Sequence, residues 1–158
     1  MNDLGGLVEN TLEFFAPLAQ ENGQTLEFRS KKTEEYLLLC DKSMVQQMLA
    51  NIIGNAIVHG GSGISIDVRL LDHPETIDII VEDTGGGIPD SQRDEVFELF
   101  KRLDNARSKP GSGLGLALVK AVADHHQAVI TLSATTPGSV EHQGLRVTVS
   151  FPKRQLQQ

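Results

Sequence analysis

The segment that decides the fold runs from residue 47 to residue 59 and reads Gln47-Met-Leu-Ala-Asn51-Ile-Ile-Gly-Asn55-Ala-Ile-Val-His59. Its apolar residues recur in adjacent pairs every four positions, which is the periodicity of an amphipathic helix. Gln47, Asn51, Asn55 and His59 are also four apart, so they form one polar row beside the apolar stripe. Asn is a poor helix former, because its side chain competes for backbone hydrogen bonds. Two Asn residues one turn apart therefore indicate either a chance placement on a solvated face or a functional row.

Size and charge limit the class of protein. The chain has 158 residues, of which 39% are hydrophobic and 22% charged, a composition typical of one globular domain. Its formal net charge of -7 and the lack of any Lys/Arg run argue against nucleic-acid binding. The single cysteine, Cys40, can form no intrachain disulfide and is predicted to be a small core residue, which suits a reducing compartment. No segment approaches 18 apolar residues and no signal sequence opens the chain, so we expect a domain that is neither membrane-spanning nor secreted and that could be cut from a larger protein.

Periodicity and turn signals predict the order of the elements. Helices are predicted at residues 4–20, 41–59 and 114–125, and strands at about 25–29, 36–40, 64–70, 77–83, 129–133 and 145–151. A short amphipathic element is expected at 94–100, and the polar tail 153–158 should fray. Because strands and helices mix without strict βαβ alternation, we predict an α+β fold. It would be a two-layer sandwich in which three main helices cover one face of a mixed, largely antiparallel sheet.

Asp83 ends the strand predicted at 77–83 with the same parity as its apolar residues. A strand that runs straight to its end would point this carboxylate toward the core, where carboxylates are rare unless a group donates to them. The segment 83–88, Asp-Thr-Gly-Gly-Gly-Ile, follows at once, and its glycines let the backbone turn sharply and approach a ligand closely. Taken alone, however, an Asp in a glycine turn is common as a purely structural feature.

A second glycine segment, Gly111-Ser-Gly-Leu-Gly-Leu116, opens the helix predicted at 114–125. Glycines before a helix start expose backbone N–H groups, and the positive end of the helix dipole favours phosphate there. A P-loop is excluded because no Gly-Lys-Ser/Thr is present, and a dinucleotide fingerprint is disfavoured because no βαβ unit surrounds the segment. Arg102, Arg107 and Lys109 precede it and are either solvated loop charges or cations that neutralise a phosphate.

The order of these motifs is specific. An Asn-bearing helix is followed by Asp83-x-Gly-x-Gly, then by Phe97-Glu-Leu-Phe-Lys-Arg102, and then by Gly-x-Gly-Leu-Gly-Leu at a helix start. In this order the chain resembles the ATP-binding catalytic domain of sensor histidine kinases, a branch of the superfamily that also holds DNA gyrase B, Hsp90 and MutL. The resemblance covers about residues 4–151. It implies a Bergerat-type ATP-binding fold, with residues 1–152 as one catalytic domain and a mobile lid at about 89–112.

The resemblance implies a role for each motif. Asn55 would coordinate the Mg2+ that bridges the ATP phosphates, and Asn51 would line the same pocket. His59 would pack against adenine, and Asp83 would accept a hydrogen bond from the adenine amino group. Gln47 is expected to lie on the surface. The nucleotide-binding residues implied in this way are Asn51, Asn55, His59, Asp83, Gly85, Gly87, Ile88, Arg102, Gly111, Ser112, Gly113, Leu114, Gly115 and Leu116, with Asn55 and Arg102 as the catalytic pair and Asn55 as the metal ligand.

Some features depart from the family pattern. Val58 stands where a Lys or Arg often reaches phosphate, and His126-Gln-Ala128 replaces the usual His-Gly-Gly turn, which should alter a loop rather than the site. None of the 5 histidines is followed by the Glu/Asp-Leu-Arg-Thr-Pro pattern of a phosphoacceptor, and the dimerisation helices are missing. We therefore expect the catalytic part of a protein-histidine kinase, which binds Mg-ATP or ADP but barely autophosphorylates alone.

The implied function is two-component signal transduction. The γ-phosphoryl group of ATP would pass to a histidine on the missing dimerisation domain and then to a response regulator, which makes that domain and the regulator the expected partners. We expect the isolated domain to be monomeric and cytoplasmic, and its parent protein could be anchored in the bacterial inner membrane. Three other readings stay open: an anti-sigma-factor serine kinase, a non-catalytic nucleotide-sensing or scaffolding module, and a clamp-type ATPase. Val58 gives slight support to the second, and the third is disfavoured because no transducer domain follows.

Overall fold

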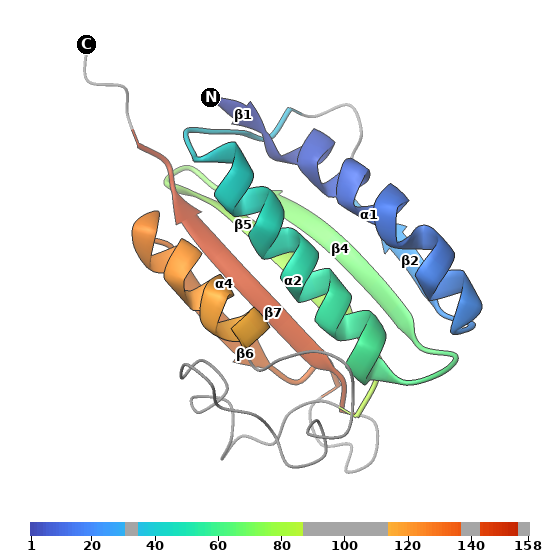
Figure 1. Cartoon of the computed structure of the whole chain (residues 1–158). Helices are drawn as coiled ribbons and strands as arrows, with labels where there is room; N and C mark the ends of the chain where they lie inside the picture. Colours follow the sequence, from blue (N-terminus) through green and yellow to red (C-terminus); the bar gives the residue numbers. More distant parts are fainter. Residues whose placement is uncertain (31–34, 87–113, 137–142, 155–158) are drawn as a thin grey trace.

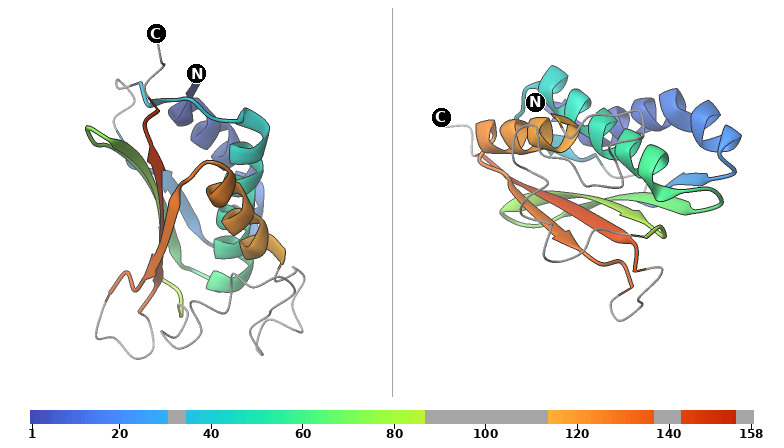
Figure 2. Two further views of the ribbon diagram at one scale, coloured as in Figure 1. Left: turned by 90° about the vertical axis from the view of Figure 1, so that its left-hand side faces the viewer. Right: turned by 60° about the horizontal axis from the view of Figure 1, so that its bottom comes forward.

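The computed structural model describes residues 1–30, 35–86, 114–136 and 143–154. Its two layers are visible in Figure 1: three helices lie side by side over one face of a sheet. They are α1 (Leu4–Glu21), α2 (Lys42–Gly60) and α4 (Leu114–His125). Figure 2 shows the layers edge-on, with α1, α2 and α4 on the same side of the sheet. The predicted α+β sandwich is therefore confirmed.

The main sheet has the strand order β2-β4-β5-β7-β6. Its centre is the antiparallel hairpin of β4 (Ser65–Asp72) and β5 (Thr76–Asp83), and β7 (Leu145–Pro152) pairs antiparallel with β5 on the far side. One edge is β6 (Val129–Ser133), and the other is β2 (Thr25–Phe28), which runs parallel to β4. The sheet is thus mixed and largely antiparallel, as predicted.

The strand predicted at 36–40 differs from the structure. Only β3 (Leu37–Leu38) is extended there, and it pairs antiparallel with β1 (Asn2–Asp3) in a separate two-stranded sheet that was not predicted. The Asp3 carboxylate explains the short pairing, since it accepts hydrogen bonds from the N–H groups of Gly5 and Gly6 and so turns the chain into α1. The Leu4 N–H donates to Tyr36 O at 2.9 Å, which closes this small sheet against the helix.

The helix starts follow from capping. The Asp41 side chain accepts from Met44 N–H at 3.0 Å, so Asp41 caps α2 as predicted. The C-terminus of α1 is closed by backbone hydrogen bonds. Asn22 N–H donates to Leu18 O, and Gly23 N–H donates to Gln20 O. Among the described residues, no helix is long and apolar enough to cross a membrane.

The core lies between the layers and is built from one face of each helix and one face of the sheet. Fully buried side chains include Leu4 and Val8 of α1, Val45, Met48, Leu49, Ile53 and Ile57 of α2, Ile66, Ile77 and Ile79 of the hairpin, and Phe151 of β7. Cys40 is half-buried and packs against this core, and Asn2 Nδ2 donates to Cys40 O. Burial raises the pKa of the Cys40 thiol, which fits its predicted place among core residues.

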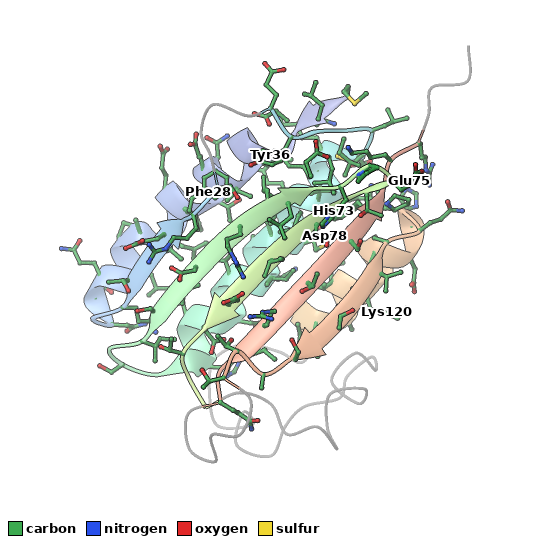
Figure 3. The ribbon with its side chains drawn as sticks, turned by 180° about the vertical axis from the view of Figure 1, so that it is seen from behind. Phe28, Tyr36, His73, Glu75, Asp78 and Lys120 are labelled. Carbon is green, nitrogen blue, oxygen red and sulfur yellow. The ribbon has the colours of Figure 1, made fainter. Side chains whose placement is uncertain are left out.

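The open face of the sheet is polar. Figure 3 views it from behind and shows His73 and Asp78 close together near the β4–β5 turn; the His73 Nε2 atom lies 3.3 Å from Asp78 Oδ2. Further along the same face, the Glu82 carboxylate contacts both Arg69 and Arg146. Hydrophobic residues thus alternate with polar or charged residues along β4 and β7 and along most of β5, where Ile80 is the exception.

Candidate functional site

The polar row of α2 runs along the helix as predicted. Asn51 and Asn55 are half-buried, whereas Gln47 and His59 are exposed. Their neighbours Met48, Ile52 and Ile53 are buried in the core, so the Asn side chains lie at the margin of the apolar face. Exposure separates Gln47 from the two Asn residues, in agreement with its predicted place on the surface.

Asp83 ends β5 and points into the molecule, as the strand parity predicts. It is only 7% exposed. Its Oδ1 atom accepts the N–H groups of Gly85 at 2.9 Å and Leu145 at 3.3 Å. Burial raises the pKa of the Asp83 carboxyl above its ordinary value, while these two N–H donors pull the pKa back down. Both of these hydrogen bonds end on Oδ1.

Gly85 brings the end of α2 into contact with the end of β5. A Cβ atom at Gly85 would lie 2.8 Å from Gly60 O and 3.1 Å from Gly60 Cα, so no side chain fits there. The same Cβ would lie 3.2 Å from Asp83 Oδ1. The helix of the Asn row and the acidic strand end thus meet at backbone contact.

Gly144 is a further site residue that sequence reasoning missed. Its φ is 64°, its N–H donates to Gly85 O at 2.9 Å, and a Cβ would lie 2.3 Å from Asp83 O. It therefore holds the 83–85 turn in place from the start of β7. The available signal was a glycine directly before a predicted strand, which alone indicates only a turn.

The start of α4 lies at the same end of the molecule. In Figure 1 the first residues of α4, the last turn of α2 and the end of β5 all lie at the lower end of the view. The helix begins at Leu114 with Gly115 next, and Leu116 is partly buried against the core. The positive end of the α4 dipole therefore faces the same region as Asp83 and the Asn row, which gives one acceptor and one anion-favouring subsite.

Several predicted site residues lie outside the described residues. These are Gly87, Ile88, Arg102, Gly111, Ser112 and Gly113, together with the predicted lid at 89–112 and the predicted element at 94–100.

The described residues fit Mg2+ only in part. In the described ranges, no group of three or more His, Cys, Asp or Glu could hold a metal ion. Carboxamide oxygens of Asn51 and Asn55 are hard, neutral donors, which suit Mg2+ when substrate phosphates supply the remaining charge. The donor set therefore fits a metal that arrives with a nucleotide.

Comparison with known proteins identifies the family. The model of the family described as histidine kinase-, DNA gyrase B-, and HSP90-like ATPase matches residues 40–155, and the chain belongs to that family. The probable sensor histidine kinase TcrY of Mycobacterium tuberculosis is 41% identical over 103 residues, which are 64% of this chain and 22% of TcrY. Within the family, the chain is therefore an ATP-binding catalytic domain of the sensor histidine kinase type, as the motif order predicted. It spans only about a fifth of such a relative.

Two solved structures share the fold. The mycobacterial sensor histidine kinase MprB superposes with a TM-score of 0.81 at 27% identity, covering 98% of this chain and 97% of that chain. The histidine kinase ThkA in complex with the response regulator protein TrrA has a TM-score of 0.75 at 18% identity, covering 97% of this chain and 41% of that chain. At 18% identity the second likeness shows the fold alone.

Proposed function

We propose that this chain binds Mg-ATP between the last turn of α2, Asp83 and the start of α4. It then presents the γ-phosphoryl group to a histidine on a dimerisation domain that lies outside this chain. The observation that carries the proposal is the buried Asp83 carboxylate, which accepts two backbone N–H groups on Oδ1 beside a glycine contact to α2. We expect its Oδ2 atom to accept a hydrogen bond from the base.

Base recognition rests on Asp83 and Gly85. The exocyclic amino group of adenine is a hydrogen-bond donor, and the Asp83 carboxylate only accepts when ionised. Guanine presents a carbonyl oxygen at the equivalent position, which would face the carboxylate without a proton between them. The lack of a side chain at Gly85 lets the Asp83 turn lie against Gly60 at the end of α2, and the exposed ring of His59 would cover the base from that end of the helix.

The phosphates would lie between the Asn row and the start of α4. Asn55 would supply an oxygen to Mg2+, Asn51 would support the same end of the nucleotide, and Gly111, Gly113, Gly115 and Arg102 would surround the phosphates. When bound, Mg2+ neutralises charge that develops on the transferring phosphoryl group. The chain's own residues orient the nucleotide, since phosphoryl transfer depends mainly on positioning and charge stabilisation. The acceptor needs no general base here, because a neutral imidazole is already a nucleophile.

The further partner would be a response regulator. ThkA has been solved with such a protein, and TcrY is described as a probable sensor histidine kinase. We infer that the phosphorylated histidine passes its group to an aspartate of a regulator.

Calorimetric titration with ADP and Mg2+ tests the nucleotide site. Saturable binding that weakens in Asn55→Ala and depends on Mg2+ supports the proposal, whereas Gln47→Ala, on the same row but exposed, should bind like the unaltered protein. An Asn55→Ala protein that binds Mg-ADP normally would refute the metal assignment, and a folded, unaltered protein that shows no heat would refute nucleotide binding.

The acceptor is tested separately with labelled ATP. Label on a histidine of a dimerisation domain supplied in trans supports the kinase assignment. Label on a serine of an antagonist protein would instead identify an anti-sigma-factor kinase, and no transfer to either would leave only a nucleotide-binding module.

A further inference from the structure

Gln24 is a buried polar residue that the proposed site does not use. It lies between α1 and β2 and is 7% exposed. Its Nε2 atom donates to Ile57 O at 2.9 Å and to Gly61 O at 2.8 Å. One carboxamide therefore bridges two carbonyl groups, one in the last turn of α2 and one just beyond that helix.

These hydrogen bonds matter because the last carbonyls of a helix have no partner within the helix. The C-terminus of α1 is closed by its own backbone, but α2 ends at Gly61 with a φ of 90° and a ψ of 173°, an extended exit rather than a tight turn. Gln24 supplies donors from another element. Burying these carbonyls without donors would be unfavourable, so the bonds fix where α2 ends.

The surface beside this turn is hollowed on the side of Gln24. An open cavity of about 480 Å3 lies there, and Val58, Gly61 and Ser62 line it together with residues 21–24 and Ile57. Among the described residues, the buried Gln24 Oε1 atom has no hydrogen-bond partner. The two carbonyls that Nε2 contacts therefore favour this orientation of the amide. Turning the amide around would place an oxygen against both carbonyls.

The turn that Gln24 holds carries the base end of the proposed site. Ile57 lies between Asn55 and His59, and Gly60 contacts Gly85 of the Asp83 turn at backbone distance. A shift at the end of α2 would therefore separate His59 and Asn55 from Asp83. We propose that Gln24 is a positioning residue that holds the last turn of α2 against the 83–85 turn and thereby sets the affinity for the adenosine part of the nucleotide. This inference rests on the proposed function.

The test compares Gln24→Met with Gln20→Met and Gln24→Lys. Met keeps the length of the Gln side chain but has no hydrogen-bond donor. Gln20→Met makes the same substitution at an exposed position away from the site and is the control. Lys restores N–H donors, and a cation at a helix C-terminus is favourable. Calorimetry with ADP and with adenosine should show about tenfold weaker binding of both ligands to Gln24→Met, since small misplacements in a site reduce binding and rate steeply. Gln20→Met and Gln24→Lys should stay within about threefold of the unaltered protein.

Amide hydrogen exchange of the ligand-free proteins gives a readout that does not need nucleotide. Exchange at residues 55–61 should accelerate in Gln24→Met relative to residues 45–50 of the same helix, and Gln24→Lys should restore it. A folded Gln24→Met protein with unchanged ADP affinity overturns the positioning role, and so does a loss that Gln24→Lys does not rescue. If the unaltered protein binds no ADP, the proposed function fails by itself. In that case, hydrogen exchange at residues 55–61 alone decides whether Gln24 holds the turn: unchanged exchange in Gln24→Met overturns the positioning role.

Discussion

At the residue scale, Asp83 combines a cost to the fold with a role in recognition. Its carboxylate is buried, and the N–H groups of Gly85 and Leu145 offset part of the loss of water. Asp83→Asn should weaken ADP binding by about 10- to 100-fold, because a charge-assisted hydrogen bond contributes about 1.5–3 kcal/mol and the amide presents a donor where an acceptor is needed. Calorimetry with ADP and GDP checks this. Unchanged ADP affinity with GDP still excluded would show that Asp83 does not read the base.

The Asp83→Asn substitution should also change how stability depends on pH. Burial raises the pKa of the Asp83 carboxyl above its ordinary value, so the folded state holds this proton more tightly than the unfolded state. Near neutral pH the unaltered protein carries the cost of a buried charge that Asp83→Asn lacks. As the pH falls through the raised pKa, protonation removes that cost. The free energy of unfolding of the unaltered protein should therefore rise relative to that of Asp83→Asn between pH 7 and about pH 4. Urea denaturation at several pH values measures it, and a constant difference would contradict it.

Gln127 explains how the chain replaces the His-Gly-Gly turn. Its φ is 57°, so a residue with a side chain takes the left-handed position after α4. The hydrogen bonds of a normal helix end are present, with Ala128 N–H donating to Ala123 O at 2.8 Å. The chain therefore forms this turn with a residue that carries a side chain, at the expense of backbone strain.

Gln127→Gly should raise the free energy of unfolding by about 0.5–1 kcal/mol. Relief of a strained left-handed residue is worth about 1–2 kcal/mol, and the greater freedom of Gly in the unfolded chain offsets part of it. Urea denaturation measures the change. Gln127→Ala is the matched control and should give no gain, because Ala is strained at the same φ. Equal stabilisation by both exchanges would contradict the strain.

At the element scale, α2 is joined to α4 by one imidazole. His126 is 7% exposed, its Nδ1 lies 2.8 Å from Val122 O, and its Nε2 accepts the Asp41 N–H at 3.0 Å. Because a backbone N–H can only donate, Nε2 must carry no proton, and the proton on Nδ1 faces Val122 O. The ring also packs edge-on against Phe151, with ring centroids 5.7 Å apart.

His126→Phe should lower the free energy of unfolding by about 1–3 kcal/mol. Phe preserves the aromatic packing but leaves the Asp41 N–H without its acceptor, which costs about that much for a buried group. Val122 O loses the ring Nδ1 and keeps the backbone N–H of residue 126. Chemical denaturation measures the loss. His125→Phe, at the exposed neighbour, is the matched control and should change the free energy of unfolding by less than about 0.5 kcal/mol. Equal losses in both variants would show that the bridge contributes nothing.

Elements with local signals could be predicted from the sequence. The Asp41 cap and the apolar stripe defined α2 within a residue or two, and alternation defined β4 and β5. The pairing of β1 with β3 could not be predicted from the sequence, because two-residue strands show no periodicity. The same holds for single residues. The proposed site residues Asn51, Asn55 and Asp83 belong to local motifs that the sequence displays. Gln24 and His126 contact groups 33 and 85 residues away in the chain, and no local pattern predicts such contacts.

At the scale of the whole molecule, the two layers depend on a segment that the family model does not reach. That model matches residues 40–155, so α1 and β2 lie outside it. Yet α1 buries Leu4, Leu7 and Val8 against α2 and the sheet, and β2 completes the edge beside β4. We therefore predict that α1 and β2 belong to the same folding unit as residues 40–155.

Deletion of residues 1–23 should abolish cooperative unfolding. Each buried Leu or Val contributes about 1.5–3 kcal/mol, so loss of the buried face of α1 removes an amount comparable to the whole stability of a domain, about 5–15 kcal/mol. The matched control deletes residues 155–158 and keeps Lys153, whose N–H donates to Glu75 O at 2.8 Å. Because the control leaves the core intact, its free energy of unfolding should change by less than about 0.5 kcal/mol. Circular dichroism during urea denaturation distinguishes the two, and a sharp, unshifted transition after deletion of 1–23 would show that residues 40–155 fold without α1.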